Sequence, residues 1–312
     1  QQDPASPCCC CCCLSVVAMA RSPPITDLTA SVLFSLAGKV AVVTGGSRGI
    51  GKEICRAYAA AGCDLVIASR KLEGCEQLAK QIQEECPGRH ALPFACNVTN
   101  WHECQRLFDF AYTSFGKVDI LVNNAGGSPF YQSLKDITES YFDKVTGLNM
   151  KGPFRLGALF GSRMCEQEGG SIINVTTVGS IMPSPNAAVY GAAKSGLNYL
   201  TETLAAAYGP KVRVNCIMPG PTLTDISKAW DLKQQLGAWK RGNALMRAGR
   251  ADELVGAALY FASQASSFTT GSILKVDGMA GVVALRDPYH KKNLDYSRDV
   301  LPQMRDDRLS KL

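Results

Sequence analysis

The stretch "KVAVVTGGSRGIGKEICRAYAAAGCDLVIASRK", residues 39–71, decides the predicted fold. It begins with an apolar run rich in β-branched residues (39–44), continues at helical spacing (49–61) and returns to a second apolar run (64–69). Continuous apolarity in a short run is typical of a strand that is covered on both faces of a parallel sheet. The stretch therefore predicts a strand–helix–strand unit.

The same alternation of apolar runs and helical spacing continues as far as Val282. Further strand candidates lie at 90–98, 119–124, 171–176, 212–218 and 272–278, and further helix candidates at 71–86, 100–115, 138–166, 188–208 and 251–264. Asn100 and Glu103 form a capping-box pattern where the third helix should begin. The alternation predicts an α/β fold in which a doubly wound parallel sheet lies between two layers of helices, the Rossmann fold.

Length and composition predict a single domain with terminal tails. The chain has 312 residues, of which 46% are hydrophobic, as is ordinary for a globular protein. We expect a low-complexity, disordered leader at 1–35, one Rossmann-fold domain at 36–284 and a tail at 285–312. The segment 221–250 breaks the alternation and is interpreted as an insertion after the sixth strand.

The 14 cysteines predict neither a disulfide framework nor a metal site. Six of them form the run Cys8–Cys13, and the others are scattered between Cys55 and Cys216. The scattered ones are interpreted as buried thiols in a reducing compartment. The run could bind soft metals or be palmitoylated, but a low-complexity leader, or translated sequence upstream of a start at Met19, is favoured.

Charge and hydropathy exclude two kinds of partner. The net charge of +6 is spread along the chain without a long basic run, so nucleic acid is not an expected partner. No apolar run approaches the roughly 20 residues that a membrane helix needs, so we expect no membrane span and a soluble protein.

The chain ends in Ser310, Lys311 and Leu312, a tripeptide that serves as a peroxisomal address when it stands at the C-terminus. The expected partner is a peroxisomal import receptor, and the expected location is the peroxisome. The protein would be cytoplasmic if this signal is not read.

The turn after the first strand indicates a dinucleotide site. In "VVTGGSRGIGKEI" (42–54), Gly45, Gly49 and Gly51 lie between a strand and a helix. Glycine allows backbone amides to approach a pyrophosphate closely, and the helix N-terminus attracts negative charge. The spacing is GxxxGxG rather than GxGxxG, and the strand–turn–helix context favours binding over a plain turn.

The end of the second strand favours NADP over NAD. An acidic residue at this position would hydrogen-bond the adenosine ribose, but Ser69 stands there and Arg70 follows, which suits a 2′-phosphate. Arg48 in the glycine turn could approach the same phosphate from the other side. The alternative is that both arginines are solvated surface residues.

Tyr190 and Lys194 lie four positions apart and therefore on one face of a helix. A neighbouring ammonium favours the phenolate, so the pattern predicts a lowered pKa for Tyr190 and a tyrosine that can act as acid or base. Taken alone, the pattern is common and would more often be an exposed helical pair; it gains weight from the motifs that accompany it.

Several short motifs follow one another over almost the whole predicted domain. They are "TGGSRGIG" (44–51), "NNAG" (123–126), Asn149 in "LNMKG", Tyr190 and Lys194 in "YGAAK", "PGPTLT" (219–224) and "VDG" (276–278). In this order and spacing, they resemble the motifs of short-chain dehydrogenases/reductases.

The resemblance implies a role for each motif. Tyr190 would donate or accept the proton, Lys194 would hold the nicotinamide ribose and tune the tyrosine, and Asn149 would hold a water in a proton relay. The "NNAG" motif would pack beside the adenosine, and 219–224 would lie along the nicotinamide. The helices at 138–166 and 188–208 would form the contacts of a homodimer or homotetramer.

The residue patterns and the resemblance together give one predicted site. The expected catalytic residues are Asn149, Thr177, Tyr190 and Lys194. The expected NADP(H)-binding residues are Gly45, Ser47, Arg48, Gly49, Ile50, Gly51, Ser69, Arg70, Asn97, Val98, Asn124, Ala125, Gly126, Tyr190, Lys194, Pro219, Gly220, Thr222 and Thr224.

Three residues depart from the family pattern. Thr177 stands where serine is usual, which keeps the hydroxyl donor but adds a methyl group and a stiffer side chain. Asn97 stands where an acidic residue is usual near the adenine, and can still accept a hydrogen bond. Met279 replaces the second glycine of a late "DGG" and should affect packing more than chemistry.

The resulting hypothesis is an NADP(H)-dependent oxidoreductase acting on a carbonyl or secondary alcohol, with Tyr190 as proton donor or acceptor. Apolar and basic residues in 225–249 suggest a lid over an apolar or lipid-derived substrate, or else an amphipathic surface helix. A peroxisomal enoyl- or dienoyl-CoA reductase is the alternative enzyme. A non-catalytic module that senses NADP is the second alternative.

Overall fold

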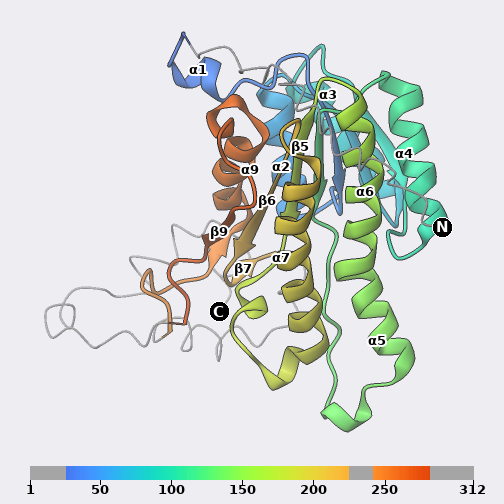
Figure 1. The fold of residues 1–312 in the computed structure, drawn as a ribbon, viewed down its shortest axis with the longest axis vertical. Coiled ribbons are helices and arrows are strands. Elements are labelled where there is room, and N and C mark those ends of the chain that lie inside the picture. Colours follow the sequence, from blue (N-terminus) through green and yellow to red (C-terminus); the bar gives the residue numbers. More distant parts are fainter. Residues whose placement is uncertain (1–25, 225–241, 282–312) are drawn as a thin grey trace, which may run out of the picture.

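A computed structural model describes residues 26–224 and 242–281, and within them the predicted fold is confirmed (Figure 1). One seven-stranded sheet, parallel throughout, has the strand order β3-β2-β1-β4-β5-β6-β9. Its strands are β1 (Val40–Thr44), β2 (Asp64–Ser69), β3 (Ala91–Ala95), β4 (Ile120–Asn123), β5 (Gly170–Val175), β6 (Val212–Pro219) and β9 (Ile273–Val276). The strand order reverses between β1 and β4, where doubly wound sheets bind their ligands.

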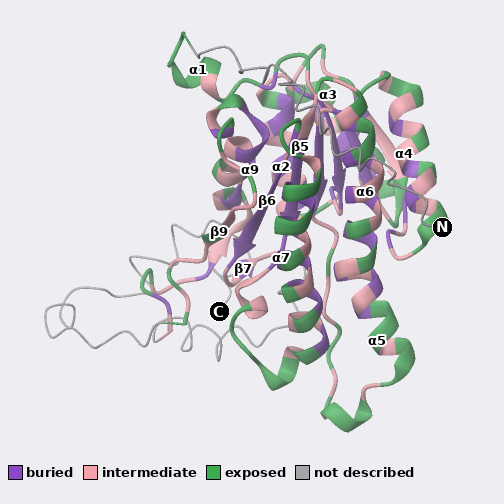
Figure 2. Ribbon diagram, viewed as in Figure 1, coloured by how far each residue is buried: buried purple, intermediate pink, exposed green. Residues whose placement is uncertain are grey.

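Helices cover both faces of the sheet. They are α2 (Gly49–Ala60), α3 (Leu72–Glu85), α4 (Trp101–Phe115), α5 (Glu139–Thr146), α6 (Gly152–Glu166), α7 (Ala188–Tyr208) and α9 (Val255–Ala262), preceded by one turn, α1 (Ala30–Leu33). Successive side chains of β1 point to opposite faces of the sheet and therefore enter two different cores. Ala41 and Val43 pack with α2, α3 and α9, whereas Val40 and Val42 pack with α4, α6 and α7. Figure 2 shows the buried sheet between helices whose outer faces are exposed.

The helix predicted at 138–166 is helical from Glu139 to Glu166, but not α-helical throughout. A π-helical turn at Gly147–Lys151 separates α5 from α6 and contains Asn149. The side chain of Asn149 donates to the carbonyl of Val145 at 2.8 Å, within the preceding turn of helix. Single π turns are frequent at functional sites, and this one carries a predicted catalytic residue.

The insertion predicted at 221–250 is described only at its two ends. There β7 (Thr222–Leu223) pairs in parallel with β8 (Gly249–Arg250), a contact that the sequence did not indicate. The bidentate ion pair between Arg247 and Glu253, at 2.6 and 2.7 Å, holds the start of the following helical turn. Most of the predicted lid lies outside the described residues.

Several further predictions fall on the segments that are not described. Residues 1–25 of the predicted leader, with its six-cysteine run, and the whole predicted tail, with the terminal Ser310, Lys311 and Leu312, lie outside the described residues. The rest of the leader, 26–35, is described and contains the helical turn α1. Within residues 26–224 and 242–281, no helix is both long and apolar enough to cross a bilayer. The same ranges bring together no group of three potential metal ligands among His, Cys, Asp and Glu.

Candidate active site

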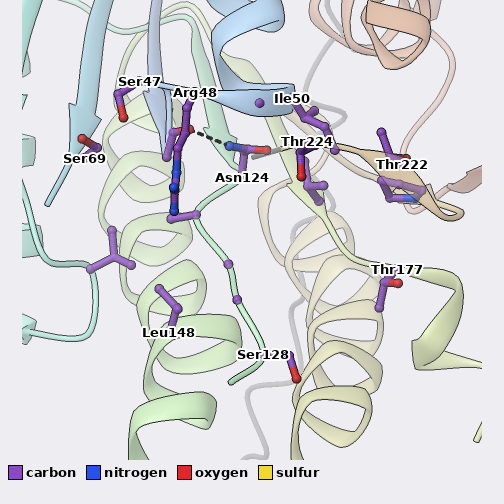
Figure 3. Close-up of a pocket in the computed structure, with 18 of the residues that line it drawn as sticks. Ser47, Arg48, Ile50, Ser69, Asn124, Ser128, Leu148, Thr177, Thr222 and Thr224 are labelled. Atoms are coloured by element: carbon purple, nitrogen blue, oxygen red, sulfur yellow. Dashed lines mark hydrogen bonds between the residues drawn. The ribbon is translucent and has the colours of Figure 1, made fainter. Parts of the chain in front are cut away.

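A cavity of about 1090 Å³ opens at the carboxyl ends of the central strands. Most of the predicted residues line it: Gly45, Ser47, Arg48, Gly49, Ile50, Ser69, Arg70, Val98, Asn124, Ala125, Gly126, Thr177, Tyr190, Lys194, Pro219, Gly220, Thr222 and Thr224. Figure 3 shows Ser47, Arg48 and Ser69 gathered at one end and Thr177 at another part of the cavity. Gly51, Asn97 and Asn149 do not line it.

The glycine turn combines two backbone conformations with one close contact. Gly45 and Gly49 have φ angles of +63° and +55°, in the left-handed region that favours glycine. A Cβ on Gly51 would lie 2.3 Å from the carbonyl oxygen of Gly45, so helix α2 can approach the turn only with glycine there. The first turn of α2 carries no acidic residue, which leaves the positive helix end available to an anion.

Asn124 fastens the turn to the adjacent strand. Its Nδ2 donates to the carbonyl oxygens of Thr44 and Gly45 at 3.0 and 3.1 Å. In return, the hydroxyl of Thr44 accepts from the backbone N–H groups of Asn124 and Ala125 at 3.1 and 3.2 Å. The "NNAG" motif therefore joins the ends of β1 and β4 on the cavity floor.

The end of β2 presents positive charge to the cavity. Arg48, Arg70 and Lys71 are exposed and line it, and no ion pair within the described residues engages any of them. The hydroxyl of Ser69 donates to the carbonyl of Lys71 at 2.9 Å and so shapes this turn. The residue directly after β2 is Arg70 rather than a carboxylate, and Glu73 in the first turn of α3 is the acidic residue that lines this end of the cavity.

The side chain of Asn97 stabilises the turn that follows β3. Its Oδ1 accepts from the backbone N–H and the hydroxyl of Thr99, at 3.3 and 3.0 Å. Its own N–H donates to Glu103 at 2.7 Å. Cys96 and Val98, on either side, line the cavity in its place, so an adenine at this end of the cavity would meet these two side chains.

Tyr190 and Lys194 occur on α7 as expected, but burial governs their pKa values. Desolvation raises the pKa of Tyr190 to about 12, although a hydrogen bond with the Thr177 side chain acts in the opposite direction. The predicted lowering of this pKa is therefore wrong for the structure. Desolvation also lowers the pKa of Lys194 to about 8. Its Nζ is buried and donates to the carbonyl of Val175 at 2.7 Å.

Thr177 lies two residues after β5 and is the N-cap of a short 3-10 turn. Its Oγ1 accepts from the N–H of Gly179 at 3.3 Å, which fixes the side chain near Tyr190. Helix α7 holds this turn closely, since a Cβ on Gly191 would lie 2.9 Å from the carbonyl oxygen of Gly179. Asn198 of the same helix donates to the hydroxyl of Ser180 at 2.8 Å.

Asn149 is fully buried behind the cavity wall. Both of its side-chain N–H groups are used, by the carbonyls of Gly127 and Val145, at 2.9 and 2.8 Å. Its Oδ1 accepts from the N–H of Gly127 at 3.2 Å. A Cβ on Gly126 would lie 3.1 Å from Asn149 Oδ1 and 3.3 Å from Lys194 Nζ, so both side chains approach the cavity at this glycine.

Sequence reasoning missed a second set of lining residues. They are Lys71, Glu73, Gly74, Gln77, Cys96, Gly127, Ser128, Leu148, Val175, Thr176, Val178 and Pro221. Many of them adjoin a predicted residue and could have been found by widening each motif by one or two positions. Gly74 and Gln77 could not, because α3 reaches the cavity through packing, with a Cβ on Gly74 lying 3.2 Å from Ser47 Cβ.

The residues present fit a nicotinamide dinucleotide. The glycine turn and the N-terminus of α2 suit a pyrophosphate. The positive rim, which consists of Arg48, Arg70 and Lys71, lies near the end of β2, where an adenosine ribose would bind. The tyrosine, the lysine and Thr177 occupy the other part of the same cavity. The same cavity therefore contains both a site suited to an anion and a group of side chains that can carry a proton.

Comparison with known proteins agrees with this geometry. The family model described as Enoyl-(Acyl carrier protein) reductase matches residues 45–279. Human dehydrogenase/reductase SDR family member 4 is 34% identical over 78% of this chain and 87% of its own length. The peroxisomal 2,4-dienoyl-CoA reductase of Danio rerio is 34% identical over 81% and 84%. The chain therefore belongs to the short-chain dehydrogenase/reductase family, a family of oxidoreductases.

A solved structure extends the likeness to a complex. A 7α-hydroxysteroid dehydrogenase in complex with NADH and 7-oxo glycochenodeoxycholic acid superposes with a TM-score of 0.77 at 31% identity. The match covers 82% of this chain and 100% of that one. The fold of this chain is thus that of a protein known to hold a nicotinamide dinucleotide.

Proposed function

We propose that the protein is an NADP(H)-dependent oxidoreductase that interconverts a carbonyl and a secondary alcohol, with the domain at 36–284 as its catalytic unit. The observation that carries this proposal is the group formed by Tyr190, Thr177 and Lys194 in the cavity that contains the glycine turn. Two hydroxyls can bind one carbonyl oxygen there, and a buried amine lies one helical turn from the tyrosine.

The bound nicotinamide would supply or accept the hydride. Tyr190 is protonated at neutral pH and can donate its proton to the oxygen of a carbonyl being reduced, but burial, which raises its pKa to about 12, makes it a weaker acid than an exposed tyrosine. Thr177 would donate a second hydrogen bond to the same oxygen as negative charge develops. Lys194, with a pKa near 8, could return a proton to the tyrosine, and Asn149 would hold the wall behind them.

The reaction can be tested on the purified protein by following NADPH oxidation with a panel of ketones and with enoyl-CoA esters. The proposal expects turnover of ketones. The alternative, reduction of an enoyl- or dienoyl-CoA, draws support from the description of the matching family model and from the zebrafish relative. Turnover of the thioesters alone would favour it. Tight NADPH binding without turnover of either would favour a cofactor-sensing module.

We also propose that NADP is preferred over NAD, because Arg48 and Arg70 border the cavity near the end of β2 and form no ion pair with another described residue. Arg70→Ala should weaken NADPH binding about tenfold or more, the effect of losing one charge-assisted hydrogen bond, and leave NADH binding unchanged. Fluorescence titration with both cofactors measures this. The control Lys80→Ala removes an exposed positive charge from α3 outside the cavity. Equal losses for NADPH and NADH would contradict the assignment.

The substrate proposed is apolar or lipid-derived. Leu148, Val178 and Pro221 line the cavity, and Ile181 and Met182 are exposed on the loop between β5 and α7. Burial of a longer apolar chain should increase affinity by about 0.8 kcal/mol for each methylene that leaves water. A KM that fails to fall along a series of lengthening ketones would speak against this class.

A peroxisomal location is proposed from the terminal Ser310, Lys311 and Leu312, and the zebrafish relative carries the same location in its name. Deleting these three residues from an N-terminally tagged protein should leave it in the cytosol, because an import receptor reads the address at the chain end. Fluorescence microscopy alongside a peroxisomal marker measures this. Unchanged import would show that the tripeptide is not the signal.

A homodimer or homotetramer is proposed through α5, α6 and α7. These helices expose Phe142, Phe154 and Tyr199, of which Tyr199 is 72% exposed in the single chain. Apolar groups of this size on neighbouring helices are typical of an interface between subunits. Light scattering should give two or four times the mass of one chain, and a monomeric mass would contradict the proposal.

A further inference from the structure

Tyr131, in the segment between β4 and α5, joins that segment to the start of α7. Its hydroxyl accepts from the backbone N–H of Ala188 at 2.8 Å and donates to the carbonyl of Pro185. Ala188 is the first residue of α7 and precedes Tyr190 by two positions. A side chain distant in sequence therefore holds the end of the helix that carries the proposed proton donor.

Helix α7 has no side-chain cap of its own. Ala187 occupies the N-cap position and makes no side-chain cap hydrogen bond, and the first turn contains no acidic residue. The first backbone N–H groups of a helix need partners from outside it, which a Ser, Thr, Asp or Asn at the N-cap usually provides. Here the hydroxyl of Tyr131 provides one such partner.

The other end of this segment is fastened to Asn149. Gly127 donates its N–H to Asn149 Oδ1 at 3.2 Å and accepts from Asn149 Nδ2 at 2.9 Å. Between these ends, the ring of Tyr131 packs edge-on against Tyr141 of α5, with centroids 5.6 Å apart. The Tyr141 hydroxyl donates to the carbonyl of Pro129 at 2.7 Å. Residues 127–131 thus form a short brace between the π turn and α7.

We propose that Tyr131 is a positioning residue, which caps α7 from outside and thereby sets where Tyr190 lies relative to Asn149. This inference rests on the proposed function, because it takes Tyr190 as the proton donor. Tyr131 acts through the helix, without contact to the reacting atoms. A displacement of about 1 Å at a proton donor can cost up to a hundredfold in rate, so a lost cap should be visible in kcat.

The first test is Tyr131→Phe, which keeps the ring against Tyr141 and removes both hydroxyl contacts. We expect kcat to fall about tenfold, the melting temperature to fall measurably, and the Kd for NADPH to change less than about twofold, because the glycine turn lies elsewhere. Thr113→Val is the control: it likewise removes one hydroxyl, at an exposed position of α4 outside the cavity and the proposed interface, and should alter none of the three.

The second test restores a cap within the helix. Adding Ala187→Asp to Tyr131→Phe places a carboxylate at the N-cap, and should recover most of both kcat and the melting temperature. A melting temperature of Tyr131→Phe equal to that of the control overturns the capping role, whether or not a substrate is known. Recovery of stability without recovery of kcat overturns the positioning role.

Failure of the proposed function has a different signature. In that case Tyr190→Phe would retain its rate, whereas failure of the present inference would leave Tyr190→Phe inactive and Tyr131→Phe fully active.

Discussion

Tyr190→Phe should reduce kcat by roughly 10²- to 10⁴-fold, the range that a positioned acid or base contributes. The substitution removes one oxygen atom and leaves the half-buried ring in place. The lost hydroxyl carries the proton that Tyr190, which is protonated at neutral pH, would donate to the substrate oxygen. The Kd for NADPH should stay within about twofold, because the glycine turn and the positive rim are untouched.

Steady-state rates and a fluorescence titration with NADPH measure the two quantities separately. Thr113→Val again provides the control, since its side chain is exposed on α4, outside the cavity and the proposed interface. A Tyr190→Phe protein that keeps most of its rate would remove the tyrosine from the mechanism. Comparison of Thr177→Ser and Thr177→Val in the same assay would then show whether the hydroxyl of Thr177 can act on the substrate oxygen without the tyrosine.

The sheet was predictable because burial on both faces leaves a direct mark on the sequence. Every residue of β1 is buried, and its side chains enter two different cores, so the strand reads as an unbroken apolar run. The helix starts were predictable where a local rule applies. Asn100 does cap α4, accepting from the N–H groups of His102 and Glu103 at 2.9 and 3.2 Å.

Features set by contacts between distant residues were not predictable. Glu103 was expected to complete the capping box, but its carboxylate accepts from the N–H of Asn97, in the turn that ends β3. The π turn at Gly147–Lys151 leaves no mark in a sequence that otherwise has helical spacing. Tyr131 was also missed, because a single tyrosine in a connecting segment belongs to no periodic pattern.

The pKa of Tyr190 also depends partly on the local sequence and partly on the fold. The sequence reveals that Lys194 lies one helical turn away, which argues for a lowered pKa. It does not reveal how far each group is removed from water, and desolvation is the largest contribution for both. Charge proximity can therefore be inferred from spacing, whereas burial requires the fold.

Gly51→Ala should have the second large effect, on both stability and cofactor binding. The added Cβ would lie 2.3 Å from the carbonyl oxygen of Gly45 and 2.5 Å from Asn124 Nδ2. Neither atom can withdraw freely, because Asn124 Nδ2 is bonded to the carbonyls of Gly45 and Thr44. The glycine turn must therefore move, at a cost of about 1–3 kcal/mol, which is typical of overpacking.

A displaced turn also loses its alignment with a pyrophosphate, so NADPH binding by Gly51→Ala should weaken at least tenfold, measured by fluorescence titration beside thermal unfolding. Gly256→Ala is the matched control, because Gly256 is exposed in α9 with no atom within 4 Å of an added Cβ. There the same substitution should leave binding unchanged and increase stability slightly, as alanine does within a helix. If Gly51→Ala binds NADPH like the control, the close contact between α2 and the turn does not shape the cofactor site.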